Sequence, residues 1–207
     1  MNYKVSELFD IAFGTKPIVY RPEKEKQAEP SAITYQGMTI TERLSEAVRV
    51  SYLGTPVVFP VTFIGSSYQV YNPSGNISRR SFATFELPPA TLVSFRRAKI
   101  ISKTKALAAR GTVKEMYGFT DWSIDIRGLC LREPSHPQAE DPYEQMRRLI
   151  EFEQIADSIE VSGELFADRS IYRLVIEDMD TPQLKGKPGV LPFRLQCSSD
   201  EPLELLL

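Results

Sequence analysis

Residues 90–131 of the chain, ATLVSFRRAKIISKTKALAARGTVKEMYGFTDWSIDIRGLCL, carry the strongest signal for its fold. From Trp122 to Arg127 apolar and polar side chains alternate, which is typical of a strand with one face in a core and one in water. Residues 92–101 are rich in β-branched and aromatic side chains, and a polar elbow around Arg110 separates the two runs. The stretch therefore predicts a long β-hairpin, and it contains no catalytic constellation.

The overall composition indicates a globular protein without a strong electrostatic field. Hydrophobic residues make up 42% of the 207 residues, which is enough to fill one core. There are 25 Lys and Arg residues against 27 Asp and Glu residues, so the net charge is −2. Such a chain is not expected to concentrate nucleic acid or anionic membranes, and its partners should be other proteins or small molecules.

The cysteines and the N-terminus bear on the cellular compartment. Cys130 and Cys197 end two apolar segments, which predicts buried free thiols in a reducing compartment and leaves a single disulfide as the alternative. The N-terminus lacks the pattern of a secretory signal, and no run reaches the ~18 apolar residues of a membrane span. We expect the chain to stay in the cytoplasm, at least until a larger particle containing it leaves.

The sequence divides into four segments. These are an N-terminal helix and arm (1–31), a β-rich segment with loops (32–89), a main β domain (90–200) and a C-terminal tail (201–207). Ser6 is expected to cap a short helix that ends at Gly14. A helix of this length is marginal alone, so its apolar side chains need a surface, either in this protein's core or on a neighbour. Residues 15–31 are polar and proline-containing, which predicts a linker or arm.

The β-rich segment is expected to be irregular. Residues 33–40 predict a strand broken at Gln36-Gly37, and residues 40–48 a helical turn that begins with a capping box. Residues 50–63 contain one glycine and two prolines, which favours an edge strand or a bulged one. Turn-forming residues predict an exposed loop over 66–81.

A helix is predicted over 142–156 of the main domain. Asp141 suits the N-cap, Pro142 the first helical position and Glu144 a capping box. Met146, Leu149 and Ile150 begin an apolar stripe and are expected to be buried. Further strands are predicted over 158–162, 171–178 and 190–197. In the last of these, one set of residues is expected to point inward (Leu191, Phe193, Leu195, Cys197) and another outward (Arg194, Gln196).

Signals for catalysis and for metal binding are weak. His136 is the only histidine, and its loop context predicts a solvated residue. The sequence has no CxxC motif and no phosphate-binding loop. Asp121 and Asp125 could share acid/base work, but no nucleophile or oxyanion partner accompanies them. We therefore predict no enzymatic activity, no cofactor and no metal site.

The middle of the chain is locally basic. The residues are Arg79, Arg80, Arg96, Arg97, Lys99, Lys103, Lys105 and Arg110. They could form one solvated face, or a patch that meets an acidic neighbour or passing nucleic acid. Trp122 shares a face with Ile124 and Ile126, which predicts a core residue and not a stacking platform.

Five ordered blocks of the sequence resemble a known family. They are FRRAKIISKTK (95–105), GTVKE (111–115), DWSIDIRGL (121–129), YRLVIED (172–178) and FRLQCSSD (193–200). Together they are similar to a family of uncharacterised tail proteins from contractile-tailed phages and prophages of Bacteroidetes. Members commonly have a Gly-Ile pair before the penultimate strand, where this chain has Arg169-Ser170-Ile171. The resemblance implies a structural part of a phage tail or baseplate near the end of the tail tube, with no catalytic residues to carry over.

We therefore expect an α+β, mainly β protein, with an antiparallel β-barrel or sandwich, one flanking helix and an extended N-terminal arm. It would act in the virion by oligomeric assembly with its own copies and other tail or baseplate proteins. DNA could pass nearby without specific binding, and no membrane is involved. The predicted assembly interface comprises Leu8, Phe9, Phe13, Arg96, Arg97, Lys99, Arg110 and Lys114. The alternatives are a monomeric β-barrel that binds a ligand or peptide, and a hydrolase with a shallow carboxylate site.

Overall fold

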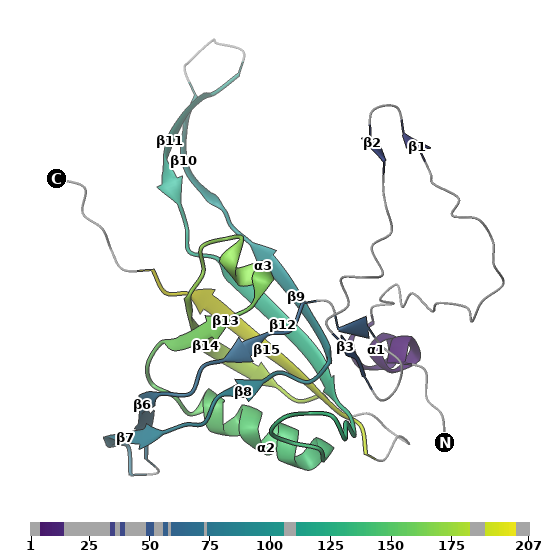
Figure 1. Ribbon diagram of the computed structural model, residues 1–207. Helices are drawn as coiled ribbons and strands as arrows, with labels where there is room; N and C mark the ends of the chain where they lie inside the picture. Colours follow the sequence, from purple (N-terminus) through teal and green to yellow (C-terminus); the bar gives the residue numbers. More distant parts are fainter. Residues whose placement is uncertain are drawn as a thin grey trace.

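A curled antiparallel sheet forms the centre of the protein (Figure 1). The computed structural model describes residues 5–14, 34–35, 38–39, 49–51, 56–57, 59–72, 74–105, 111–182 and 189–201. Seven strands form the half-barrel sheet, in the order β8 (Phe85–Glu86), β5 (Thr62–Phe63), β13 (Ile159–Ser162), β14 (Arg173–Asp180), β15 (Leu191–Ser199), β12 (Ser123–Cys130) and β9 (Ala90–Arg96). The described helices are α1 (Val5–Phe13), α2 (Pro142–Glu153) and α3 (Glu164–Ala167). The prediction of a mainly β fold with a flanking helix is confirmed.

The remaining described strands form two-stranded hairpins. They pair as β1 (Thr34–Tyr35) with β2 (Met38–Thr39), β3 (Arg49–Val50) with β4 (Pro56–Val57), β6 (Ser67–Tyr71) with β7 (Ile77–Ser81), and β10 (Lys99–Thr104) with β11 (Val113–Phe119). The break predicted at Gln36-Gly37 and the helical turn predicted over 40–48 both lie outside the described residues. The predicted edge strand over 50–63 is instead split among β3, β4 and β5, and β5 is an interior strand of the sheet.

The prediction of an exposed loop over 66–81 was wrong. Turn residues occupy only the tip, where the Asn72 N–H donates to the Asn76 carbonyl, and β6 and β7 flank it. Tyr68 and Val70 alternate with more exposed residues along β6 and are buried in the main core. This two-residue period outweighs the local turn propensity, because it buries apolar area only if the segment is a strand.

The inner face of the sheet holds the main core. Ile124 and Ile126 on β12 are buried, and they alternate with more exposed residues as predicted. On β15 the predicted alternation also holds, with Phe193, Leu195 and Cys197 buried. Cys130 and Cys197 are both free and buried, as expected, and burial raises the pKa of both thiols, that of Cys197 to about 12. Thiols this buried remain protonated and behave as small apolar side chains.

Helix α2 packs against this inner face, and one of the three residues predicted to be buried is instead exposed. It begins at Pro142 as predicted and ends at Glu153, three residues early. Leu149 is fully buried and Met146 partly buried, whereas Ile150 is 42% exposed, so its predicted burial was wrong. Gln145 takes the buried position instead, and its Nε2 donates to the carbonyls of Leu131 and Ala139.

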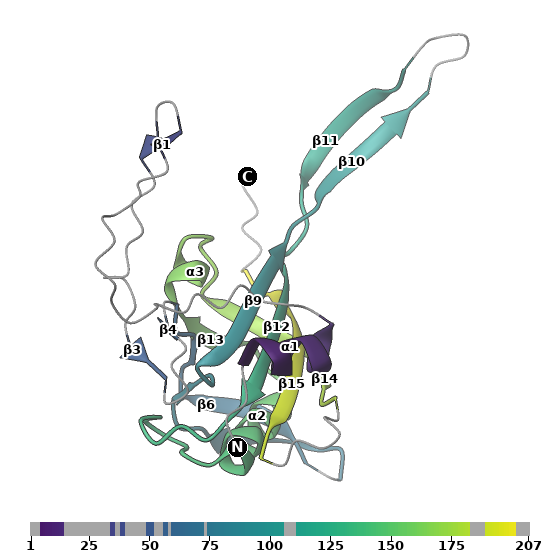
Figure 2. The ribbon, with the colours of Figure 1, turned by 90° about the vertical axis from the view of Figure 1, so that its right-hand side faces the viewer.

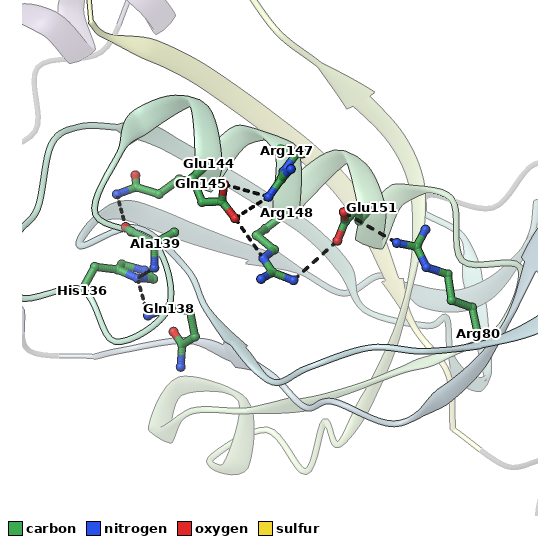
Figure 3. A network of polar contacts seen from close by, with 9 residues as sticks. All are labelled: Arg80, His136, Gln138, Ala139, Glu144, Gln145, Arg147, Arg148 and Glu151. Atoms are coloured by element: carbon green, nitrogen blue, oxygen red, sulfur yellow. Dashed lines mark hydrogen bonds and ion pairs between the residues drawn. The ribbon is translucent and has the colours of Figure 1, made fainter.

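The capping at the start of α2 also differs from the prediction. Asp141 has the extended backbone of an N-cap, but its side chain makes no capping hydrogen bond. Glu144 does not reach back to it, because its carboxylate accepts two hydrogen bonds from Arg147, at 2.7 and 2.8 Å (Figure 3). An ion pair with a nearby arginine therefore replaces the expected capping box.

His136 is buried, so the prediction of a solvated histidine was wrong. Its Nδ1 accepts hydrogen bonds from the backbone N–H groups of Gln138 and Ala139, at 3.2 and 3.0 Å (Figure 3). The proton must then lie on Nε2, which donates to the Glu86 carbonyl at 2.9 Å. The imidazole ties the loop before α2 to β8, which is a structural role.

Helix α1 covers one end of the opposite, outer face of the sheet (Figure 2). Leu8 and Phe9 are buried against Ala90, Leu129 and Val190. The apolar side of α1 therefore lies on this protein's own core, which was one of the two surfaces expected from the sequence; the other was a neighbouring protein. The helix ends at Gly14 as predicted, but it starts at Val5, which places Ser6 inside the helix and not at its cap.

Candidate assembly interface

The β10–β11 hairpin projects from the sheet as a continuation of β9 and β12 (Figures 1 and 2). Pairing runs from Ala90 opposite Leu129 up to Arg96 opposite Ser123, and resumes from Lys99 opposite Phe119 to Thr104 opposite Val113. The long hairpin predicted from residues 90–131 is therefore confirmed. The elbow was predicted around Arg110 to Glu115, but residues 113–115 belong to β11, and Arg110 lies outside the described residues.

A β-bulge near the base of the hairpin changes its direction. Ile100 lies opposite Gly118 and Ile101 opposite Met116, so Tyr117 is an extra residue on β11. Gly118 has a φ of +149°, which glycine adopts without steric cost. Bulges of this kind bend a ribbon and increase its twist.

Stacked cations and aromatic rings brace the hairpin against the sheet. The Arg97 guanidinium lies 5.0 Å from the Phe119 ring and 5.2 Å from the Trp122 ring, and its Nε donates to the Thr120 carbonyl at 3.0 Å. Phe95 meets Trp122 edge-on, with 6.3 Å between ring centroids, and both rings pack against the main core as predicted for Trp122. Each cation–π contact at an exposed site contributes about 0.5–1 kcal/mol, so the base of the hairpin is stiffened.

The hairpin exposes large apolar side chains from its base to its outer end. Their exposed fractions lie between 48% for Ile100 and 68% for Tyr117, and the set is Ile100, Val113, Met116, Tyr117 and Phe119. Met116, Tyr117 and Phe119 were not singled out from the sequence, because the elbow was predicted around Arg110 to Glu115 and the alternating pattern was noted only after Gly118. Their pairing with the β-prone residues 99–104 was the signal that could have revealed them.

The structure separates the predicted interface residues into two groups. Leu8, Phe9 and Phe13 belong to α1, where the first two are buried against the sheet and Phe13 is partly buried. Arg97, Lys99 and Lys114 lie along the hairpin, and all three are exposed. Arg96 ends β9 at the hairpin base.

A shallow hollow lies on the outer face of the sheet. It has a volume of about 290 Å³, and Arg96, Asp125, Glu177 and Arg194 are among its lining residues. Asp125 accepts hydrogen bonds from both Arg127 and Arg194, the latter from Nε at 2.8 Å. Burial raises the pKa of this carboxyl, but the bonds from the two arginines outweigh burial and hold the pKa below its usual value.

These carboxylates are poorly placed for acid/base catalysis. The two arginines hold the pKa of Asp125 below its usual value, whereas a general acid or base needs a pKa nearer neutrality. Asp121 is exposed and precedes β12, whereas Asp125 lies within that strand. Among the described residues no group of three or more His, Cys, Asp or Glu side chains could hold a metal ion.

Two further observations concern the class of protein. Within the described part of the chain, no helix is long and apolar enough to cross a membrane. The fold and the hairpin together define a mainly β protein, with a curled antiparallel half-barrel and a braced, apolar projection.

Residues 86–207 match a family described as a domain of unknown function, DUF6046, and the chain belongs to this family. The matched region contains the strands from β9 to β15, and therefore the whole projecting hairpin. No curated protein matches the chain.

Proposed function

We propose that the protein is a structural component of a contractile phage tail or baseplate, and that it acts by oligomeric assembly near the end of the tail tube. Its partners would be its own copies and other tail or baseplate proteins, and its location the virion. The observation that carries the proposal is the projecting hairpin with five exposed large apolar side chains.

A projecting two-stranded hairpin needs a surface to pack against. An isolated two-stranded ribbon is marginally stable in water, and β10–β11 has no third strand beside it among the described residues. Contiguous exposed apolar surface on a soluble protein typically marks an interaction site. A hairpin that is braced at its base and exposes five large apolar side chains is therefore suited to pack against a neighbouring subunit.

The phage setting rests on the sequence resemblance. All five resembling blocks fall on the sheet and its hairpin, namely on β9, β10, β11, β12, β14 and β15. They therefore describe the same structural unit that presents the projection, and not the arm predicted at residues 15–31. The imidazole, thiol and carboxylate groups described above have structural roles, which agrees with a non-enzymatic function.

Replacing apolar side chains on the hairpin tests this function. The variant Val113→Ser, Met116→Ser, Tyr117→Ser changes three exposed residues, and Tyr143→Ser, Tyr172→Ser is a matched control with residues 64% and 66% exposed elsewhere. We expect the hairpin variant to fold, as judged by circular dichroism, but to remain monomeric in sedimentation velocity and to be missing from purified tail particles. The control should assemble normally. Normal incorporation of the hairpin variant, or absence of the wild-type chain from tails, would contradict the proposal.

A further inference from the structure

The two faces of the β10–β11 hairpin differ in charge. Paired residues of a ladder lie on the same face, and residues two apart on a strand share it. One face, here called the basic face, therefore carries Lys99, Ile101, Lys103, Lys114, Met116 and Phe119. The sole carboxylate of β10 and β11, Glu115, belongs to the other face, where it accepts a hydrogen bond from Tyr117 at 2.7 Å.

Two lysines lie directly opposite each other on the basic face. Lys103 pairs with Lys114 in the ladder, and neither forms an ion pair with a described residue. Like charges at directly opposed positions destabilise a sheet, so this pair weakens the hairpin in the free protein. An anionic partner surface would remove that cost, and Ile101 with Met116 beside the lysines would supply an apolar contact.

The same protein carries a strip of exposed negative charge on its sheet. Glu177, Asp178 and Asp180 on β14 are exposed, and no ion pair joins them to another described residue. Arg194 lies opposite Asp180 in the ladder, but its Nε and Nη2 already donate to Asp125. We call Glu177, Asp178 and Asp180 the acidic strip.

We propose that the basic face of the hairpin docks on the acidic strip of a second copy of this chain. The hairpin projects away from the sheet, whereas the strip lies on the sheet and is separated from β12 by β15, so a second molecule is the natural source (Figures 1 and 2). This inference rests on the proposed assembly function and names the partner surface. Opposite charges would set the register and speed the encounter, and the apolar residues would form the dry centre of the contact.

Each hairpin contact joins two different surfaces, the basic face of one copy and the acidic strip of another. Two copies can exchange hairpins about a two-fold axis, which closes a dimer. If each copy instead passes its hairpin on to the next one, the head-to-tail contacts generate a ring when the rotation closes and an open filament when it does not.

Reversing the charges on each surface separately tests the pairing. One full-length variant carries Lys103→Glu, Lys114→Glu and the other carries Asp178→Lys, Asp180→Lys. Neither should self-associate as the wild type does at low salt, with apparent affinity lowered about tenfold or more, because each lost pair also becomes repulsive. An equimolar mixture should associate again, since each hairpin then finds a strip of opposite charge. Exposed acids elsewhere provide the control, Glu153→Lys, Glu164→Lys, which should associate as the wild type does.

Several outcomes would overturn the inference. A mixture that remains dissociated in sedimentation velocity, a strip variant that associates normally, or a wild-type chain that stays monomeric at low salt would each do so. If the strip variant enters tail particles normally while the apolar hairpin variant does not, the hairpin binds another tail protein; the proposed function then stands and this inference fails. If duplex DNA binds the wild type and the strip variant but not the Lys103, Lys114 variant, the occupant is nucleic acid and the inference also fails.

Discussion

Two neighbouring residues of α2 should respond very differently to truncation to alanine. Leu149 is completely buried in the main core, whereas Ile150 is 42% exposed. Leu149→Ala removes buried methyl groups and leaves a cavity, which costs about 2–5 kcal/mol in free energy of unfolding. Ile150→Ala removes side-chain surface that is already partly in water, so its cost should be about 1 kcal/mol or less.

The difference is large compared with the stability of a typical domain, about 5–15 kcal/mol. Guanidinium-induced unfolding of the full-length chain, followed by circular dichroism and by the fluorescence of the single tryptophan, measures both free energies. The gain in helix propensity on going to alanine is small and similar for both residues, so it does not obscure the comparison. Equal costs, or a larger cost for Ile150→Ala, would show that α2 presents a different side to the sheet and would refute the packing described above.

Substitutions at Gly128, Asp125 and Arg97 each test one set of contacts. Gly128→Ala should lower the free energy of unfolding by about 1–3 kcal/mol, because an added Cβ would lie 2.5 Å from Cε1 of the buried Phe193 ring. Thermal or chemical unfolding measures this change. Unchanged stability would mean that the ring can move aside. Asp125→Asn should destabilise the folded protein at pH 7, because it removes the carboxylate that accepts hydrogen bonds from Arg127 and Arg194. The pKa of Asp125 is lower in the folded state, so its contribution to the free energy of unfolding is present above the unfolded pKa of about 3.9 and is lost as pH falls through the folded pKa. The difference in free energy of unfolding between variant and wild type should therefore disappear in acid. A difference that does not change with pH would contradict the ion-pair explanation. Arg97→Ala removes two cation–π contacts and should speed hydrogen exchange of the amides in β10 and β11 about fivefold or more, while exchange in β15 stays unchanged; equal rates in the hairpin would show that the brace is not stabilising.

The sequence alone determined the elements that depend on local pattern. The alternation around Ile124 and along β15 specified strands with one buried face, because a two-residue period can bury an apolar set only in a strand. Asp141-Pro142 located the start of α2, since proline is compatible with the first helical position. The family resemblance could also be read from the sequence, because each of its blocks is a run of consecutive residues, and these runs lie in the strands of the sheet and the hairpin.

Only the tertiary structure decided which surfaces those elements cover. Gln145 replaces Ile150 on the buried side of α2, because the carbonyls of Leu131 and Ala139, from the chain between β12 and α2, accept hydrogen bonds from its Nε2. His136 is buried because β8, fifty residues earlier, supplies an acceptor for its ring. The exposed apolar and basic side chains of the β10–β11 hairpin become a projecting surface only because the sheet ends at Arg96 and Ser123 while the pairing continues. Such partners are remote in sequence, and local propensity carries no information about them until the chain has folded.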